Sequence, residues 1–128
     1  MGYAVKCILV KGNQFLLVKH IKDNDDLWIF PGGKLNENES PEDCVKREML
    51  EEMGLVIEKY ESIGEMQNIW KERDDLLYLF VCQVTDDKIT INKKEIREFA
   101  WFPGDKLPPL GPTSTKILKI WEKIKSSN

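Results

Sequence analysis

The amino-acid sequence predicts an α/β protein in which a mixed β-sheet lies between helices. Two observations lead to this fold class. The hydrophobic period changes between two and about 3.6 along the chain, in the order β-β-β-α-β-β-β-α, and each expected helix carries one apolar face. A sheet covered by a helix on each side buries both of its faces, which gives an α/β/α sandwich. A chain of 128 residues supports one domain, so we expect a single domain over residues 1–128.

Composition and charge are those of an ordinary globular protein. Hydrophobic residues make up 41% of the chain, charged residues 32%, and the formal net charge is −3. The absence of a basic block argues against a surface for duplex nucleic acid. No apolar run approaches the roughly 20 residues of a membrane span, and the apolar stretch 4–10 is short and carries Lys6, so we interpret it as a strand. Three cysteines without zinc spacing indicate buried free thiols in a cytoplasmic protein: Cys7, Cys44 and Cys82.

The first expected elements are a hairpin and a short strand. Residues 3–10 and 14–20 are two strand-like runs around a Lys-Gly-Asn turn. The polar stretch 22–26 reads as a solvated loop, and residues 27–30 as a third strand that leads into Pro-Gly-Gly. His20, the one histidine, is too isolated to build a triad or a zinc site, so we expect it to be structural.

A helix over residues 41–53 has clear start and stop signals. Ser40 can cap a free amide of the first turn, and Pro41 stands at the first helical position, where no donor is needed. Gly54 tolerates the left-handed conformation that ends many helices. An apolar stripe would dock the helix on the core: Val45, Met49 and Met53.

Three glutamates lie beside that stripe and indicate a metal site. Glu48, Glu51 and Glu52 are spaced i, i+3 and i+4, so they project from one face. Two carboxylates about 4 Å apart repel by roughly 4 kcal/mol at an effective dielectric near 20. Arg47 offsets part of this repulsion, and a divalent cation would remove the rest. Carboxylate oxygens favour hard cations, Mg²⁺ or else Mn²⁺.

The second half of the chain returns to strands and ends in a helix. The run 76–84 is the most continuous apolar stretch, which is typical of a central buried strand. Residues 113–125 form an amphipathic helix with lysines on its wet side. The other expected elements are a long strand over 55–70, turns at 71–75 and 85–88, a short strand at 89–91 and a strand within 95–103.

The spacing of polar and glycine residues around the helix identifies a family resemblance. The motif REMLEE alone would be typical of a solvated acidic face. At average residue usage, however, the whole pattern would agree by chance about once in 10⁸ starts. The pattern resembles the signature box of the Nudix hydrolases over Gly33–Leu55, and its matching positions are Gly33, Glu39, Arg47, Glu48, Glu51, Glu52, Gly54, Met49 and Leu55.

The resemblance implies a Nudix-type α/β/α sandwich and a metal-dependent phosphoanhydride hydrolase. We assign Glu48 and Glu52 as principal metal ligands and Glu51 as a further or water-mediated ligand, while Arg47 would orient the carboxylates. Glu39 would support the loop or a water-bridged metal.

Two further roles come from the same resemblance. The carbonyl of Gly32 matches one that helps to hold the metal ion. Glu95, with Glu98 as the alternative, matches a glutamate that faces the box helix. The general base stays open among Glu51, Glu52 and Glu95.

The expected substrate is a nucleoside diphosphate linked to another moiety. In the family that this chain resembles, members acting on ADP-ribose carry a proline shortly after the box, and residues 56–73 contain none. Members acting on diadenosine polyphosphates carry a tyrosine around the position of Glu72, where none is present, and the added motif of the coenzyme A type is absent. By subtraction we expect a nucleoside triphosphate or modified nucleotide. Lys34 could bind phosphate, and Phe30 and Trp70 could stack on a base. The alternatives are a nucleotide-sensing module without catalysis and an acidic helix in a structural protein; we expect a monomer or homodimer and a small-molecule nucleotide as partner.

Overall fold

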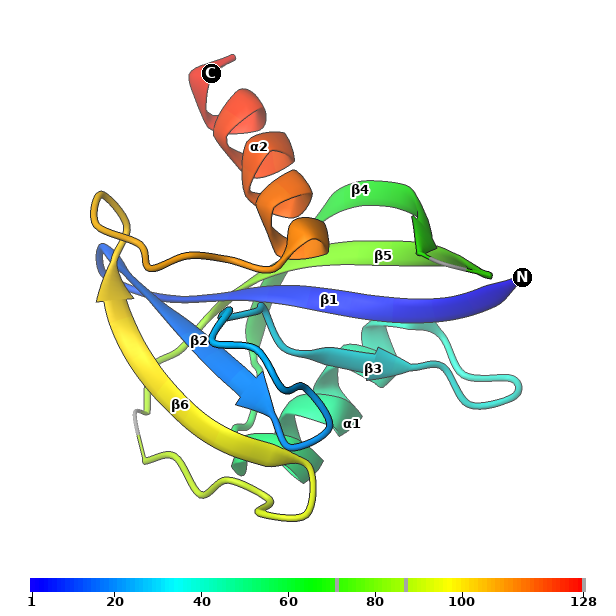
Figure 1. Cartoon of the computed structure of the whole chain (residues 1–128), viewed down its shortest axis with the longest axis horizontal. Helices are drawn as coiled ribbons and strands as arrows, with labels where there is room; N and C mark the ends of the chain where they lie inside the picture. The colour runs from blue at the N-terminus through cyan, green and yellow to red at the C-terminus, as the bar shows by residue number, and fades with distance from the viewer. Residues whose placement is uncertain (71, 87, 128) are drawn as a thin grey trace.

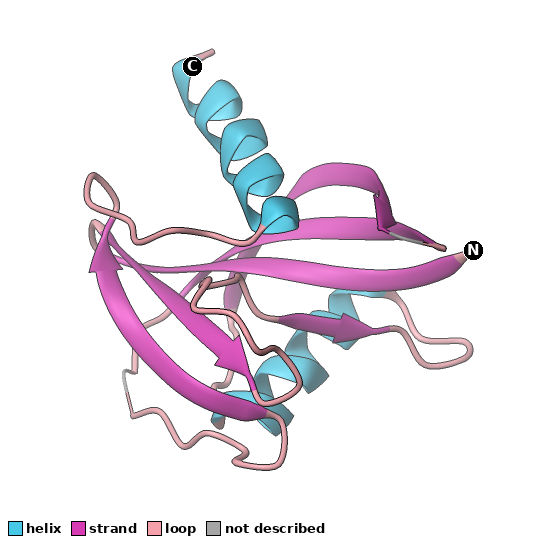
Figure 2. Cartoon of the chain, viewed as in Figure 1, coloured by secondary structure: helices cyan, strands magenta, loops and turns pink. Residues whose placement is uncertain are grey.

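The computed structural model describes residues 1–70, 72–86 and 88–127, with Trp70 described by its backbone alone. Two helices and a mixed sheet follow in the predicted order (Figures 1 and 2). The elements are β1 (Gly2–Lys11), β2 (Gln14–His20), β3 (Gly32–Lys34), α1 (Pro41–Met53), β4 (Lys59–Trp70), β5 (Arg73–Gln83), β6 (Ile96–Pro103) and α2 (Pro112–Ser126).

The sheet is mixed, as predicted. Its strand order is β4-β5-β1-β2-β6, and β3 pairs with β1. Strands β1 and β5 run parallel, whereas the pairs β1–β2, β1–β3, β2–β6 and β4–β5 are antiparallel. Strand β1 pairs with β3 over Ala4–Lys6 and with β2 over Leu9–Lys11, so its two halves serve different neighbours.

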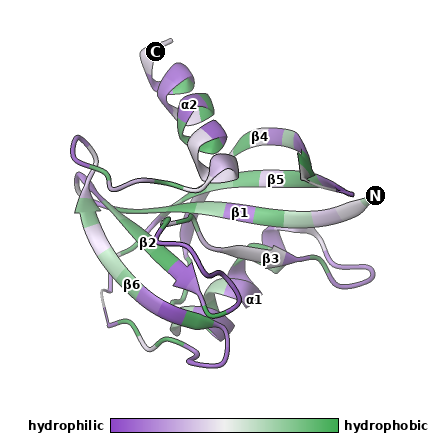
Figure 3. Ribbon diagram, in the orientation of Figure 1, coloured by the Kyte–Doolittle hydropathy of each residue, from purple (hydrophilic) through white to green (hydrophobic). Residues whose placement is uncertain are grey.

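Helices α1 and α2 cover opposite faces of this sheet, as Figure 1 shows. The period of two along β1 sends Val5, Cys7 and Leu9 toward α1, and Ile8 toward α2. Each face therefore has its own apolar cluster, and Figure 3 shows the hydrophobic colour running along β5, which contributes to both. The sandwich predicted from the sequence is confirmed.

Helix α1 begins and ends where its capping residues predict. The Ser40 hydroxyl accepts from the Asp43 amide at 3.1 Å, a cap that typically stabilises a helix by about 1 kcal/mol. Gly54 ends the helix with φ 67°, and its amide donates back to the Leu50 carbonyl. Burial of Val45, Met49 and Met53 holds the helix on the sheet.

Three predicted strands differ from the structure. Residues 27–30 form isolated bridges rather than a strand, because Trp28 bridges to Leu110 and Ile29 to Val18 on different neighbours. The strand expected over 55–70 begins at Lys59. Residues 89–91 form no strand: the Thr90 amide donates to the Met53 carbonyl at 3.0 Å and so satisfies the end of α1.

The remaining sequence predictions have mixed outcomes. Parts of the turns expected at 71–75 and 85–88 lie outside the described residues, but β5 already begins at Arg73. The three cysteines are buried and free, with the Cys7 and Cys82 sulfurs 2.7 Å apart. Neither of the helices described here is long and apolar enough to cross a membrane.

Candidate active site

A cleft of about 670 Å³ lies where β1, β3, α1 and the start of α2 meet. Five carboxylates line it: Glu48 and Glu52 from α1, Glu95 from the turn before β6, Asp23 from the loop after β2, and Asp75 from β5. Thus the structure brings together three of the glutamates that the sequence singled out.

Glu52 is the most buried of these carboxylates. Its side chain is 1% exposed, and its Oε2 has no hydrogen-bond partner among the described residues. Burial, followed by the charge of Glu48, raises its pKa to about 8. Its Oε1 lies 3.7 Å from Nε2 of His20, too far for a hydrogen bond. A buried carboxylate oxygen without a partner costs free energy unless a ligand satisfies it.

Glu48 lies one turn before Glu52 and packs against β3. Burial raises its pKa, although the guanidinium of Arg47 opposes this by donating from Nη1 to Oε1 at 2.8 Å. A Cβ added at Gly33 would overlap the Glu48 carboxylate. A side chain at this position would therefore displace the carboxylate, and glycine leaves room for it.

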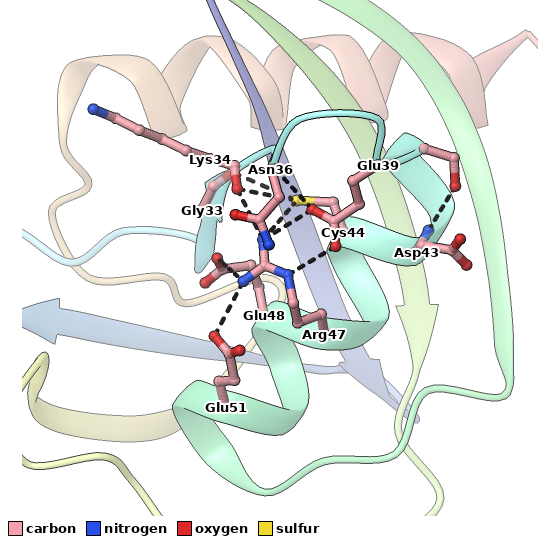
Figure 4. A network of polar contacts seen from close by, with 10 residues as sticks. Gly33, Lys34, Asn36, Glu39, Asp43, Cys44, Arg47, Glu48 and Glu51 are labelled. Carbon is pink, nitrogen blue, oxygen red and sulfur yellow. Dashed lines mark hydrogen bonds and ion pairs between the residues drawn. The ribbon is translucent and has the colours of Figure 1, made fainter.

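Arg47 joins the loop after β3 to helix α1 (Figure 4). Its Nε and Nη2 donate to the two oxygens of Glu39 at 2.8 and 2.9 Å, and Nη2 also donates to the Lys34 carbonyl at 3.0 Å. These bonds hold the pKa of Glu39 down at about 2. The two-point contact is therefore with Glu39, and Glu48 and Glu51 each receive one bond from Nη1. Of the two roles predicted for Glu39, support of the loop or of a water-bridged metal, these contacts agree with the first.

Glu51 lies apart from the cleft. Its side chain is 56% exposed, and its Oε2 accepts from Arg47 at 3.1 Å. Glu95 fits the expected position facing the helix, because it lines the cleft and its charge contributes to the raised pKa values of Glu48 and Glu52. The alternative, Glu98, instead lies 3.6 Å from the ammonium group of Lys19.

The cleft residues suit a hard divalent cation, although they supply only part of the oxygen ligands that such a cation takes. Among the described residues, no three His, Cys, Asp or Glu side chains converge as a ready metal site. Glu48 and Glu52 nevertheless offer two desolvated carboxylates, one with an unpartnered oxygen, and Gly32 adds backbone to the same cleft. Phosphate oxygens and water would have to complete the coordination.

The structure places the three residues expected to bind the nucleotide in different surroundings. Lys34 lines the cleft with an exposed side chain. Phe30 cannot stack on a base: it is 0% exposed and packs edge-to-face on Phe15 beneath α2. The stacking role expected for Phe30 is therefore wrong, because its ring belongs to the core. The side chain of Trp70 lies outside the described residues.

Sequence reasoning missed several residues that the fold brings to the cleft. Lys6 enters from β1, and His20, the last residue of β2, lies beside Glu52. Thr113, at the start of α2, donates to the Asn68 side chain at 3.2 Å. A charged residue inside the apolar strand 4–10 was the one available signal, whereas the Thr113–Asn68 contact joins segments far apart in the chain.

The comparisons with known proteins agree on one family. The model of the NUDIX domain family matches residues 2–120. The NAD-capped RNA hydrolase NudC of Vibrio parahaemolyticus is 29% identical over 112 residues, which make up 85% of this chain and 42% of that relative. The chain therefore spans less than half the length of this curated relative.

Solved structures show the same fold. The MutT NUDIX hydrolase of Burkholderia pseudomallei has a TM-score of 0.84 at 22% identity, covering 92% of this chain and 95% of that one. The NUDIX domain of Shewanella oneidensis NrtR, crystallised with ADP ribose, has a TM-score of 0.78 at 19% identity and covers 97% and 88%. Because the family model matches nearly the whole chain and the box lies on the cleft, this chain belongs to the NUDIX domain family, the Nudix hydrolases.

Proposed function

We propose that this protein hydrolyses a phosphoanhydride bond in a nucleoside diphosphate linked to another moiety, and that it requires a divalent cation, Mg²⁺ or Mn²⁺. The observation that carries the proposal is the buried, unpartnered Oε2 of Glu52 beside Glu48 in an open cleft. A folded protein keeps such a group in place when a ligand supplies the missing partner.

Each cleft residue then has a defined task. Glu48, Glu52 and the Gly32 carbonyl would hold the cation, which when bound neutralises phosphate charge and makes an attacking water more acidic. Glu95 lines the same cleft and, like Glu52, is a candidate to take the proton of that water, whereas Glu51 lies apart from the cleft. Arg47 acts through the carboxylates by fixing Glu48 and the loop that carries Glu39.

The favoured substrate is a nucleoside triphosphate or a modified nucleotide. The relatives widen the choice, because one hydrolyses NAD-capped RNA and a structural neighbour binds ADP ribose. All of these ligands contain a nucleoside diphosphate, so the shared chemistry is a charged phosphate chain joined to a nucleoside.

A nucleotide panel with Mg²⁺ and with Mn²⁺ tests the proposal. It should include nucleoside triphosphates, NAD and ADP-ribose, with the products identified so that the broken bond is known. We expect cation-dependent cleavage of at least one class and loss of at least about 10²-fold in Glu52→Gln, since the carboxylate acts on the reacting phosphate. Glu58→Gln, an exposed glutamate outside the cleft, is the matched control. Binding without cleavage of any compound would favour the sensing module instead.

A further inference from the structure

Lys6 is a cation placed inside the cleft by the sheet itself. It lies on β1 between Val5 and Cys7, which pack toward α1, so the alternation of the strand turns the Lys6 side chain to the other side of β1. Its neighbour in the register is Gly32 of β3. A Cβ added at Gly32 would lie 3.0 Å from Cδ of Lys6. The Lys6 side chain therefore runs along the backbone of Gly32, which also lines the cleft.

The ammonium group of Lys6 lacks a full set of partners. Its Nζ donates to the Phe30 carbonyl at 3.1 Å. Among the described residues, Nζ makes no other hydrogen bond and forms no ion pair within 4.0 Å. An ammonium group has three donors, so two can donate to a ligand. Burial lowers the pKa of Lys6, while the charge of Glu52 in the same cleft opposes that shift.

The other cations around the cleft differ from Lys6 in exposure. All of them are solvent-exposed: Lys22, Lys34, Arg73 and Lys94. Exposed ammonium groups are already hydrated and gain little from an anion, whereas a partly desolvated one gains a charge-assisted bond. A phosphate chain brought to Glu48 and Glu52 by a cation would place its remaining anionic oxygens within this same cleft.

We propose that Lys6 is a substrate-binding residue whose ammonium group donates to an oxygen of the nucleotide's phosphate chain, beside the carboxylates of α1. This inference rests on the proposed function and deepens it, because it names, among the cations of the cleft, the partly desolvated one that would contact a polyanionic substrate. Phe30 then contributes through its backbone carbonyl, which positions the ammonium group, rather than through its ring.

Binding of inorganic pyrophosphate in the presence of Mg²⁺, followed by calorimetry, tests this role without requiring catalysis. Lys6→Met should bind pyrophosphate about tenfold or more weakly, because a charge-assisted hydrogen bond is lost. Lys119→Met removes the same charge from the exposed face of α2 and should bind as the unsubstituted protein does. Where a substrate is found, the KM of the Lys6 variant should rise by a similar factor.

Three results would overturn the inference. They are unchanged pyrophosphate affinity in Lys6→Met, an equal loss in Lys119→Met, and no pyrophosphate binding by the unsubstituted protein. If Lys6→Met fails to fold, Lys6→Gln can still donate to the Phe30 carbonyl without a charge, and it should show the same tenfold loss; full affinity in that variant counts against the role. Failure of the proposed function is separate, since it would appear as a nucleotide panel without cleavage while the Lys6 effect on pyrophosphate persists.

Discussion

Glu52 combines burial, a like-charged neighbour and an oxygen without a partner, so its ionisation is linked to the stability of the fold. Its pKa is raised from 4.5 to about 8 in the folded protein. The folded state therefore binds the proton more tightly than the unfolded chain does. Without a divalent cation, the resulting stability is fully present below about pH 4.5 and is lost as the pH rises toward 8.

This linkage predicts a fall in melting temperature between pH 5 and 8 when EDTA is present. Glu52→Gln should flatten that fall and should be more stable than the unsubstituted protein at pH 8, by an amount on the order of a few kcal/mol. Mg²⁺ should raise the melting temperature of the unsubstituted protein most at the alkaline end. Thermal melts of both proteins across this range, followed by circular dichroism, measure the effect. Parallel pH profiles in the two proteins would mean that Glu52 is not the group responsible.

At the scale of elements, Arg47 fastens helix α1 to the loop that follows β3. Lysine could replace its charge but not its planar two-point contact with Glu39 and its bond to the Lys34 carbonyl. We expect Arg47→Lys to lower the free energy of unfolding by about 1–3 kcal/mol. Arg97→Lys, which loses one bond to the Asp25 carbonyl, should change it little.

The same substitution should alter acid unfolding. The pKa of Glu39 is lowered to about 2, so its stabilising effect is present above about pH 4.5 and is lost as the pH falls toward 2. Without the Arg47 guanidinium, acid unfolding should begin at a higher pH, as an acid titration followed by fluorescence would measure. An unchanged acid transition in Arg47→Lys would contradict the role given to this contact.

Local signals and long-range contacts explain which elements could be predicted. Helix α1 was predictable to the residue because its end signals are local: Ser40 and Pro41 act on its first turn, and Gly54 acts on its last turn. Residues 89–91 were predicted as a short strand, but the Thr90 amide donates to the Met53 carbonyl at the end of α1, distant in the chain. Phe30 was misassigned for the same reason, because its burial depends on Phe15 and the α2-side cluster.

The candidate site shows the same division. Its α1 residues follow from helical spacing, which placed Glu48 and Glu52 one turn apart. The other walls come from β1, the turn before β6 and the start of α2, and their meeting depends on the sheet order. Lys6 therefore went unnoticed as a site residue, and the expected position of Glu95 came from family resemblance rather than from spacing.

At the scale of the whole molecule, charge balance makes cation and nucleotide interdependent. The chain carries a net charge of −3, and the cleft presents Glu48, Glu52 and Glu95 to a polyanionic ligand. Without a cation, these carboxylates repel a phosphate chain. Without a phosphate chain, the cation lacks a complete set of ligands, because no three acidic, His or Cys side chains among the described residues converge on one point. Each partner should therefore strengthen binding of the other.

We expect Mg²⁺ to tighten binding of a methylene-bridged nucleoside triphosphate at least about tenfold, and the nucleotide to tighten Mg²⁺ by the same factor, because coupling between two ligands is reciprocal. Calorimetry with and without EDTA measures both. The double variant Glu48→Gln and Glu52→Gln separates repulsion from coordination when it is measured above about pH 8, where Glu52 of the metal-free protein is ionised. There it should bind the metal-free nucleotide more tightly than the unsubstituted protein does, since the repelling charges are gone, yet show no Mg²⁺ response. Nucleotide affinity that ignores the chelator in the unsubstituted protein would contradict the coupling, and a Mg²⁺ response that survives in the double variant would place the cation elsewhere.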